Sequence, residues 1–230
     1  MKTIGLIGGM SWESTATYYE LMNQDVSARL GGLHSAKIAM VSVDFAEIER
    51  AQVEGRWHDA GAALADVARS LERAGADFLV LATNTMHKVA DAFDAAIGLS
   101  LLHIGEVTGA AIAEQGLSTV GLLGTRFTME QDFYRAVLEQ RYGLKVLVPD
   151  ATGVDAINAV IYDELCQGRI EEASRASAAD VISGLVERGA EGVILGCTEL
   201  PLLIRQDDSQ VPLFDTTRLH ARAAVDKALE

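Results

Sequence analysis

The sequence is poor in residues that mark several common classes of protein. Its 230 residues include two cysteines, Cys166 and Cys197, and three prolines. The cysteines form neither a Cys-x-x-Cys pair nor a zinc-ligand spacing, and free thiols are typical of a reducing compartment. No apolar run approaches the roughly 20 residues that cross a bilayer, and the run at residues 3–7 is too short for a secretory signal. We therefore expect a soluble, cytoplasmic protein.

Positive charge is also scarce. Asp and Glu number 33 against 19 Lys and Arg, which gives a formal net charge of −14. A surface of this sign repels nucleic acid and anionic membranes, so neither is an expected partner. A small anionic substrate stays possible, because a local site can differ from the overall field. Four histidines are scattered without ligand spacing, so no metal site is predicted: His34, His58, His103 and His220.

One stretch of the sequence is repeated with small changes. Residues 75–85 read Gly-Ala-Asp followed by a short apolar run, and residues 189–199 read Gly-Ala-Glu followed by another. Such a run after a turn signal is typical of a strand buried on both faces. Thr83 follows the first run and Cys197 the second, 114 positions later (197 minus 83). The repeat predicts that these two residues occupy equivalent places.

A second pair of segments supports a duplication. Residues 3–8 resemble residues 119–124 at an offset of 116 (119 minus 3). Two matches in the same order, at nearly one offset, indicate two related halves. The alternative is that buried strands of α/β proteins read alike.

Expected strands and helices alternate along the chain. Apolar runs bounded by glycine predict strands, and apolar positions in steps of three and four predict helices. The expected strands are 3–7, 37–43, 77–82, 99–104, 119–123, 144–148, 192–196 and 211–214. The expected helices are 14–29, 57–74, 106–115, 128–140, 152–166, 171–187 and one from about 217, with another that starts at 83–87 and a short helix or loop at 46–52.

This alternation predicts an α/β fold with two pseudo-symmetric domains, each a parallel sheet covered by helices. We place the first domain at 1–97 plus 216–230, which carries Thr83, and the second at 98–215, which carries Cys197. Open α/β sheets bind ligands at the carboxyl ends of their strands, where both residues are expected. The active site is therefore expected in the cleft between the domains.

Thr83 and Cys197 can each carry a proton. On opposite walls of a cleft they could remove a proton from one face of a carbon and return one to the other, without metal or cofactor. A helix N-terminus lowers the pKa of a thiol, so a thiolate is expected at Cys197. Thr83 would rest as a hydroxyl, and as a base it would need a neighbour or water to relay the proton. The alternatives are a buried structural thiol and a helix N-cap.

Polar groups beside both residues could hold a substrate carboxylate. They are the Asn84 amide and the hydroxyls of Thr85 and Thr198. Glu199 could bind the substrate amino group or orient Cys197. As a residue of a first helical turn, Glu199 also has a purely structural explanation.

Three motifs together resemble the aspartate/glutamate racemase family. They are Gly-Gly-Met-Ser at 8–11, Thr-Asn-Thr-Met-His at 83–87 and Gly-Cys-Thr-Glu at 196–199. The resemblance covers essentially the whole chain. It implies two pseudo-symmetric α/β domains, no cofactor, a homodimer, and a catalytic pair at the inter-domain cleft. That pair is usually two cysteines. Here Thr83 takes the first place, as in an enterobacterial branch described both as L-aspartate/glutamate-specific and as broad-specificity amino-acid racemases.

The resemblance also assigns roles to individual residues. Thr83 and Cys197 would be the acid/base pair. The substrate α-carboxylate would be held by Asn84, Thr85 and Thr125. Further candidates for the pocket are Met10, Gln52 and Thr198.

Two departures from the family bear on the substrate. Members selective for aspartate carry a Lys in the segment at 164–168 and a basic residue in the loop at 44–47, and neither is present here. A side-chain carboxylate then has no obvious partner unless Arg126 or Lys88 turns inward, which favours neutral amino acids. The expected function is a cofactor-independent amino-acid racemase. The alternatives are a malonate-type decarboxylase or cis-trans diacid isomerase on this scaffold, and a catalytically weakened amino-acid-binding protein.

Overall fold

The computed structural model describes residues 1–94 and 97–230. These residues form two compact units, unit 1 (Met1–Ile104 with His220–Glu230) and unit 2 (Gly105–Leu219). The sequence analysis set the divisions at residues 98 and 216. In the structure the chain passes from unit 1 to unit 2 at the start of α5 (Ile104–Glu114), and returns within α11 (Thr216–Leu229).

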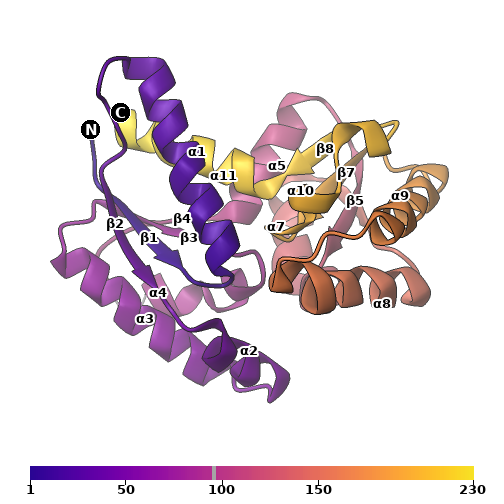
Figure 1. Ribbon diagram of the computed structural model, residues 1–230, viewed down its shortest axis with the longest axis horizontal. Helices are drawn as coiled ribbons and strands as arrows, with labels where there is room; N and C mark the ends of the chain where they lie inside the picture. The colour runs from indigo at the N-terminus through magenta and orange to yellow at the C-terminus, as the bar shows by residue number, and fades with distance from the viewer. Residues whose placement is uncertain (95–96) are drawn as a thin grey trace. The chain divides into compact units, whose positions relative to one another are not determined.

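Within the described residues, unit 1 contains a four-stranded parallel sheet in the order β2-β1-β3-β4. Its strands are β1 (Ile4–Gly8), β2 (Ile38–Ser42), β3 (Phe78–Leu81) and β4 (Leu101–Leu102). Its helices, besides the end of α11, are α1 (Trp12–Leu30), α2 (Phe45–Val53), α3 (Trp57–Arg73), the 3₁₀ helix η1 (Thr85–Val89) and α4 (Asp91–Asp94). Figure 1 shows α1 and α11 along one face of this sheet and α3 along the other.

The two faces of this sheet carry separate apolar cores, because successive side chains of a strand point in opposite directions. Leu6 and Val80 pack toward α1 and α11 in one core cluster. Ile7 and Leu81 pack toward α3 in another. The sheet is therefore buried on both faces, as the continuous apolar runs predict.

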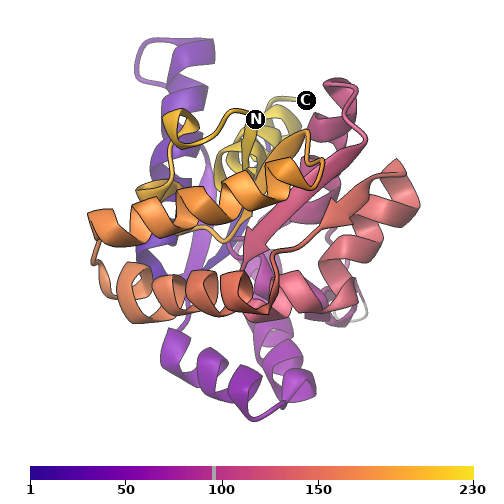
Figure 2. The same ribbon diagram turned by 90° about the vertical axis from the view of Figure 1, so that its right-hand side faces the viewer.

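In the part of unit 2 that the structure describes, a second four-stranded parallel sheet has the order β6-β5-β7-β8. Its strands are β5 (Thr119–Gly124), β6 (Lys145–Leu147), β7 (Gly192–Gly196) and β8 (Leu213–Asp215). Its helical segments, besides α5 and the start of α11, are α6 (Arg126–Glu130), α7 (Asp132–Tyr142), α8 (Ala151–Ala159), the π-helix η2 (Val160–Glu164), the 3₁₀ helix η3 (Leu165–Gln167), α9 (Glu172–Glu187), α10 (Leu200–Leu203) and η4 (Gln206–Asp208). Figure 2 shows α8 and α9 side by side, and both pack against the apolar face that Leu123 and Val193 share.

The two units repeat one hydrogen-bond arrangement at the start of their central strands. In unit 1 the Asp77 carboxylate accepts a hydrogen bond from the Thr3 backbone N–H at 2.6 Å. In unit 2 the Glu191 carboxylate accepts one from the Thr119 N–H at 2.9 Å. The backbone N–H groups of Asp77 and Glu191 each donate back, to the carbonyls of Thr3 and Thr119, at 2.8 Å. Together with the matching strand orders, these contacts confirm the predicted α/β fold in two similar parts.

Several expected elements differ in extent. The strand expected at 99–104 is β4, which covers only Leu101–Leu102, because Ile104 already begins α5. The helix expected at 128–140 is two helices, because Gln131 between them adopts an extended conformation. The segment at 46–52 is the helix α2. None of the helices among the described residues is long and apolar enough to cross a membrane.

Candidate active site

Each unit gathers polar residues at the carboxyl edge of its two central strands. In unit 1, Ile7 of β1 pairs with Leu81 of β3, so the chain leaves both strands at one edge. In unit 2, Gly124 of β5 pairs with Gly196 of β7. Thr125 and Cys197 directly follow these paired glycines. This is where open α/β sheets place their ligands.

The paired glycines explain how the strand ends of unit 2 approach so closely. A Cβ atom on Gly124 would lie 2.8 Å from the carbonyl oxygen of Gly196. A Cβ atom on Gly196 would lie 2.7 Å from the carbonyl oxygen of Leu123. Real Cβ atoms do not make contacts this short, so only glycine allows this separation of the backbones.

The buried carboxylate of Glu199 organises the site of unit 2. The Cys197 thiol donates a hydrogen bond to Glu199 Oε2 at 2.9 Å. The Thr198 hydroxyl donates to the same oxygen, also at 2.9 Å. All three residues are buried, and Cys197 is 7% exposed. A thiol and a hydroxyl therefore share one carboxylate oxygen as acceptor.

The electrostatics of this site correct the expectation of a resting thiolate. Burial raises the pKa of the Cys197 thiol well above its usual range, and the negative charge of Glu199 raises this pKa further, as does Cys166. The helix that follows, α10, has only four residues and begins at Leu200. Because a helix dipole acts mainly on groups at a terminus, this short helix does not offset burial next to a carboxylate. Cys197 rests as a protonated thiol.

Thr125 lies at the start of α6. Its side chain is the N-cap of that helix and accepts a hydrogen bond from the Thr128 N–H at 3.3 Å. The two threonine hydroxyl oxygens are 3.2 Å apart. The hydroxyl that the family resemblance assigns to the substrate carboxylate thus also caps a helix.

In unit 1, Thr83, Asn84 and Thr85 follow β3 and are buried. The N-cap position of η1 is occupied by Asn84. Capping of this helix therefore does not explain Thr83. The imidazole of His87, which lies within η1, is 2.8 Å from the Thr83 carbonyl oxygen through Nδ1, and its Nε2 accepts a hydrogen bond from the Ile104 N–H at 3.2 Å. This leaves the proton on Nδ1, so His87 donates to Thr83 and fixes its backbone.

Two further histidines lie beside His87, the buried His220 and the half-buried His103. The rings of His103 and His220 lie 4.6 Å and 6.0 Å from the His87 ring, measured between centroids. His220 lies 2.8 Å from the Leu102 carbonyl through Nε2, and the Tyr18 hydroxyl lies 2.9 Å from its Nδ1. Burial lowers the pKa of His87 well below its usual range and that of His220 to about 4. The sequence analysis missed this cluster, because no spacing along the chain joins these residues.

Gln52 and Met10, the two other candidates for the pocket in unit 1, have different surroundings. Gln52, near the end of α2, is 3% exposed, and its amide nitrogen lies 3.0 Å from Met86 Sδ. Its carbonyl oxygen has no hydrogen-bond partner among the described residues. Met10 instead packs into the apolar core beside Ile48 and Ala51. Gln52 thus offers a buried acceptor, and Met10 offers apolar surface.

The two cations that could have turned toward a substrate carboxylate are engaged elsewhere. Lys88 Nζ lies 3.8 Å from the centroid of the Trp57 ring. Arg126 forms ion pairs with Glu130 and Asp155 at an exposed site. Among the residues that the structure describes, no three His, Cys, Asp or Glu side chains gather as a metal site would require.

Comparisons with known proteins identify the family of this chain. The sequence model of the Asp/Glu/Hydantoin racemase family matches residues 7–224. The broad specificity amino-acid racemase RacX of Bacillus subtilis (strain 168) is 26% identical over 163 residues, which cover 71% of this chain and 70% of RacX. The crystal structure of a candidate Asp/Glu racemase from Yersinia pestis is 54% identical over the whole of both chains, with a TM-score of 0.93. An aspartate racemase homologue from Pyrococcus horikoshii OT3 is 35% identical over the whole of both chains, with a TM-score of 0.83. The chain belongs to the Asp/Glu/hydantoin racemase family.

Proposed function

We propose that this protein is a cofactor-independent amino-acid racemase that inverts the α-carbon by two-base proton transfer between Cys197 and Thr83. One observation supports the proposal: in each of the two similar units the residue follows the end of the equivalent strand, Cys197 directly after β7 and Thr83 two residues after the end of β3. Family membership supports the reaction class. In the proposed enzyme the two strand ends flank one substrate α-carbon in a cleft.

The Cys197 half of the reaction depends on Glu199. A protonated thiol cannot take the α-proton, so the thiol proton must first leave. Glu199 Oε2, 2.9 Å from Sγ, accepts it. The resulting thiolate then removes the α-proton, and the carbanion-like state is stabilised by donors around the substrate carboxylate.

The Thr83 half supplies the returning proton. Its hydroxyl protonates the opposite face of the carbon, and water or a neighbouring group then reprotonates the alkoxide. Glu199 returns its proton to solvent, so the cycle ends with the same groups protonated as at the start. Asn84, Thr85, Thr125 and Thr198 supply the donors to the α-carboxylate.

Gln52 binds the substrate amino group in this scheme. Its buried carbonyl oxygen has no partner in the described residues. An ammonium group would supply the missing donor, which removes the cost of an unsatisfied buried acceptor. Met10 adds apolar contact near the substrate.

We further propose that neutral amino acids are accepted. Lys88 lies over the Trp57 ring in a pocket lined by none of the proposed site residues, and Arg126 is paired with two carboxylates, so neither is placed to bind an acidic side chain of the substrate. The similarity to RacX, whose name states broad specificity, points the same way. The similarity to a candidate Asp/Glu racemase keeps acidic substrates in the test panel.

Proton NMR of L- and D-amino acids in D₂O tests the reaction and its range together. The expected result is loss of the α-proton signal with formation of both enantiomers. Cys197→Ala should abolish the exchange, and Thr83→Cys should keep or raise it. Cys166→Ala removes the other cysteine of the same unit and should leave exchange unchanged. Full exchange in Cys197→Ala would remove our assignment of the base.

The same experiment separates the alternatives. A decarboxylase of malonate type needs one proton donor, and would place deuterium in its product without loss of stereochemistry. A diacid isomerase would convert a cis diacid and leave the panel unchanged. An amino-acid-binding protein would bind ligands without any α-proton exchange.

Cross-linking tests the cleft without relying on activity. In a Cys166→Ala background, Thr83→Cys creates a single pair of thiols with Cys197. A short bifunctional thiol reagent should link them within one chain, and an amino-acid ligand should protect them. A matched variant with a thiol on the exposed residue Ala63 should give no such link. Failure of the pair to link would contradict a shared cleft.

We also propose that the protein forms a homodimer through an exposed apolar face of unit 1. Trp12, Tyr19 and Met40 are 69%, 53% and 49% exposed, and they line one hollow on α1 and β2. Exposed apolar surface of this kind is typical of protein interfaces. Sedimentation should show a dimer that Met40→Lys weakens, and an unchanged dimer in that variant would exclude this face.

A further inference from the structure

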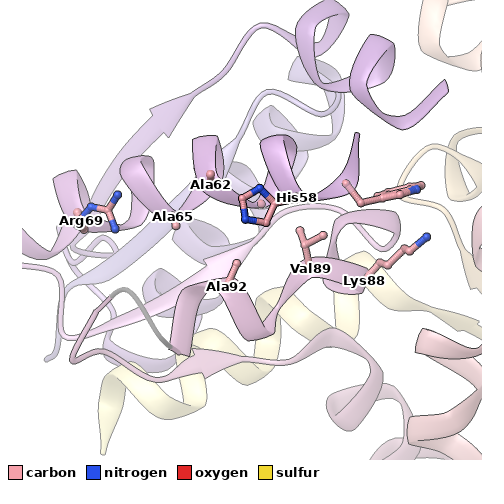
Figure 3. Close-up of a pocket in the computed structure, with 9 residues that line it drawn as sticks. His58, Ala62, Ala65, Arg69, Lys88, Val89 and Ala92 are labelled. Carbon is pink, nitrogen blue, oxygen red and sulfur yellow. The ribbon is translucent and has the colours of Figure 1, made fainter. Parts of the chain in front are cut away.

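A groove on unit 1 lies apart from the residues of the proposed reaction. It has a volume of about 440 Å³ and lies between α3 and the segment formed by η1 and α4 (Figure 3). Small apolar residues form its walls: Gly61, Ala62 and Ala65 on α3, with Val89 and Ala92 opposite. This volume is in the range that holds small organic ligands.

The charge of this groove is opposite to that of the protein. Its lining, all within the described residues, includes His58, Arg69 and Lys88 and no Asp or Glu. The chain as a whole has a formal charge of −14. Because Arg69 is paired with Asp66 and His58 lies beside Asp59, the positive charge of the groove that is unpaired among the described residues is that of Lys88, which attracts anions that the rest of the surface repels.

Lys88 is the cation best placed to bind a ligand. Among the described side chains it forms no ion pair, whereas Arg69 is paired with Asp66. Its ammonium lies over the Trp57 ring at 3.8 Å from the centroid, so its position is set by an aromatic face. Burial lowers the pKa of Lys88, and an anion bound beside the ammonium would raise this pKa again.

We propose that this groove binds a small amphiphilic carboxylate, with its carboxylate at Lys88 and its alkyl chain along the small residues of α3. His58 and Arg69 are eleven residues apart on this helix, which corresponds to roughly 16 Å of helix axis. The groove is therefore long enough for an extended alkyl chain. Its walls of Gly, Ala and Val offer apolar contact to an alkyl chain.

The groove and the proposed active site share the short helix η1, which could couple ligand binding in the groove to substrate binding. Lys88 and Val89 of this short helix line the groove, and Thr85 of the same helix is one of the proposed substrate-binding residues. In this proposal, a ligand held at Lys88 also changes the position of Thr85 in the same short helix. This second step rests on the proposed racemase function, whereas binding in the groove does not.

Calorimetric titration with octanoate tests the binding, with octanamide as the uncharged probe of the same shape. We expect octanoate to bind one site at millimolar concentration or below, at least fivefold more tightly than octanamide. Lys88→Met should weaken octanoate at least fivefold and leave octanamide unchanged. Lys145→Met, at an exposed lysine of unit 2, is the control for net charge. Equal affinity for both probes, or no effect of Lys88→Met, would overturn the proposal.

A second pair of variants tests the location. Ala62→Phe fills the groove from an exposed position, and Ala63→Phe adds the same ring at the next residue, which does not line it. Octanoate binding should be lost only in Ala62→Phe, with thermal unfolding unchanged in both. Equal binding by both variants would overturn this location. In the exchange assay, saturating octanoate should change KM at least twofold, and an unchanged KM would overturn only the link to the active site.

Discussion

Acidification should destabilise unit 1 through the buried histidine His220. Its imidazole is held by the Tyr18 hydroxyl and the Leu102 carbonyl, and burial, with a contribution from His103, lowers its pKa to about 4. An unfolded histidine has a pKa of about 6.5. Below that value the unfolded chain binds the proton and the folded chain does not. Stability is therefore complete above about pH 6.5 and is lost as the pH falls toward 4.

The size of the effect follows from the two pKa values. Linkage gives a loss of roughly 2 kcal/mol at pH 5, with a limit of about 3.4 kcal/mol below both pKa values. His87 has a lowered pKa as well, so it adds to the loss with the same sign. Both losses concern unit 1, which contains both residues.

Urea denaturation at pH 7.5, 6 and 5 measures this dependence. The two tryptophans, Trp12 and Trp57, both lie in unit 1, so their fluorescence reports its unfolding. Between pH 7.5 and pH 5, the free energy of unfolding falls in both proteins. The fall should be roughly 2 kcal/mol smaller in His220→Gln than in the unmodified protein. His34→Gln, at an exposed histidine, should behave as the unmodified protein. If His220→Gln kept the full dependence on pH, the reasoning from its burial would be refuted.

Four further substitutions test single residues. Glu199→Gln removes a charge that raises the pKa of Cys197, so iodoacetamide should alkylate this thiol at a lower pH, as mass spectrometry would show; an unchanged profile would contradict the role of Glu199. Gln52→Leu should raise KM at least fivefold and leave the free energy of unfolding unchanged or higher, because its carbonyl is unsatisfied without substrate. Gly109→Ala should cost about 1–3 kcal/mol in a denaturant melt, because its Cβ would lie 2.3 Å from an aromatic ring of α7. Gly184→Ala meets no atom within 4 Å and should stabilise its helix by about 0.5–1 kcal/mol; equal effects of the two alanines would contradict the packing argument.

The strands around the candidate site could be predicted because their signal is local. Apolar runs bounded by glycine gave β1, β3, β5 and β7 within a residue or so. The duplicated Gly-Ala-acid turn marked equivalent places in the two units. The acid is present in each because the carboxylates of Asp77 and Glu191 accept a hydrogen bond from the backbone of the neighbouring strand. Both contacts depend on residues that adjoin the strands.

Other features depend on contacts that the order of residues does not carry. The expectation of a thiolate at Cys197 was wrong, because burial of the thiol and the Glu199 carboxylate beside it raise its pKa. The histidine cluster joins α11 to residues more than a hundred positions earlier, through the return of the chain to unit 1. The break at Gln131 interrupts a helix without proline or glycine, so no local signal marks it.

The duplication also explains an asymmetry in the proposed reaction. At the offset of 114 residues, Thr83 corresponds to Cys197, and Thr85 corresponds to Glu199. Only the proton carrier of unit 2 thus has a carboxylate at that place, bound to its thiol at 2.9 Å. In the proposed mechanism Cys197 has a built-in acceptor for its proton, whereas Thr83 depends on a relay. This difference cannot favour one enantiomer at equilibrium, because enantiomers have equal free energies in water and kcat/KM must be the same in both directions. It can appear only in the separate values of kcat and KM, and in which enantiomer exchanges its α-proton before it inverts.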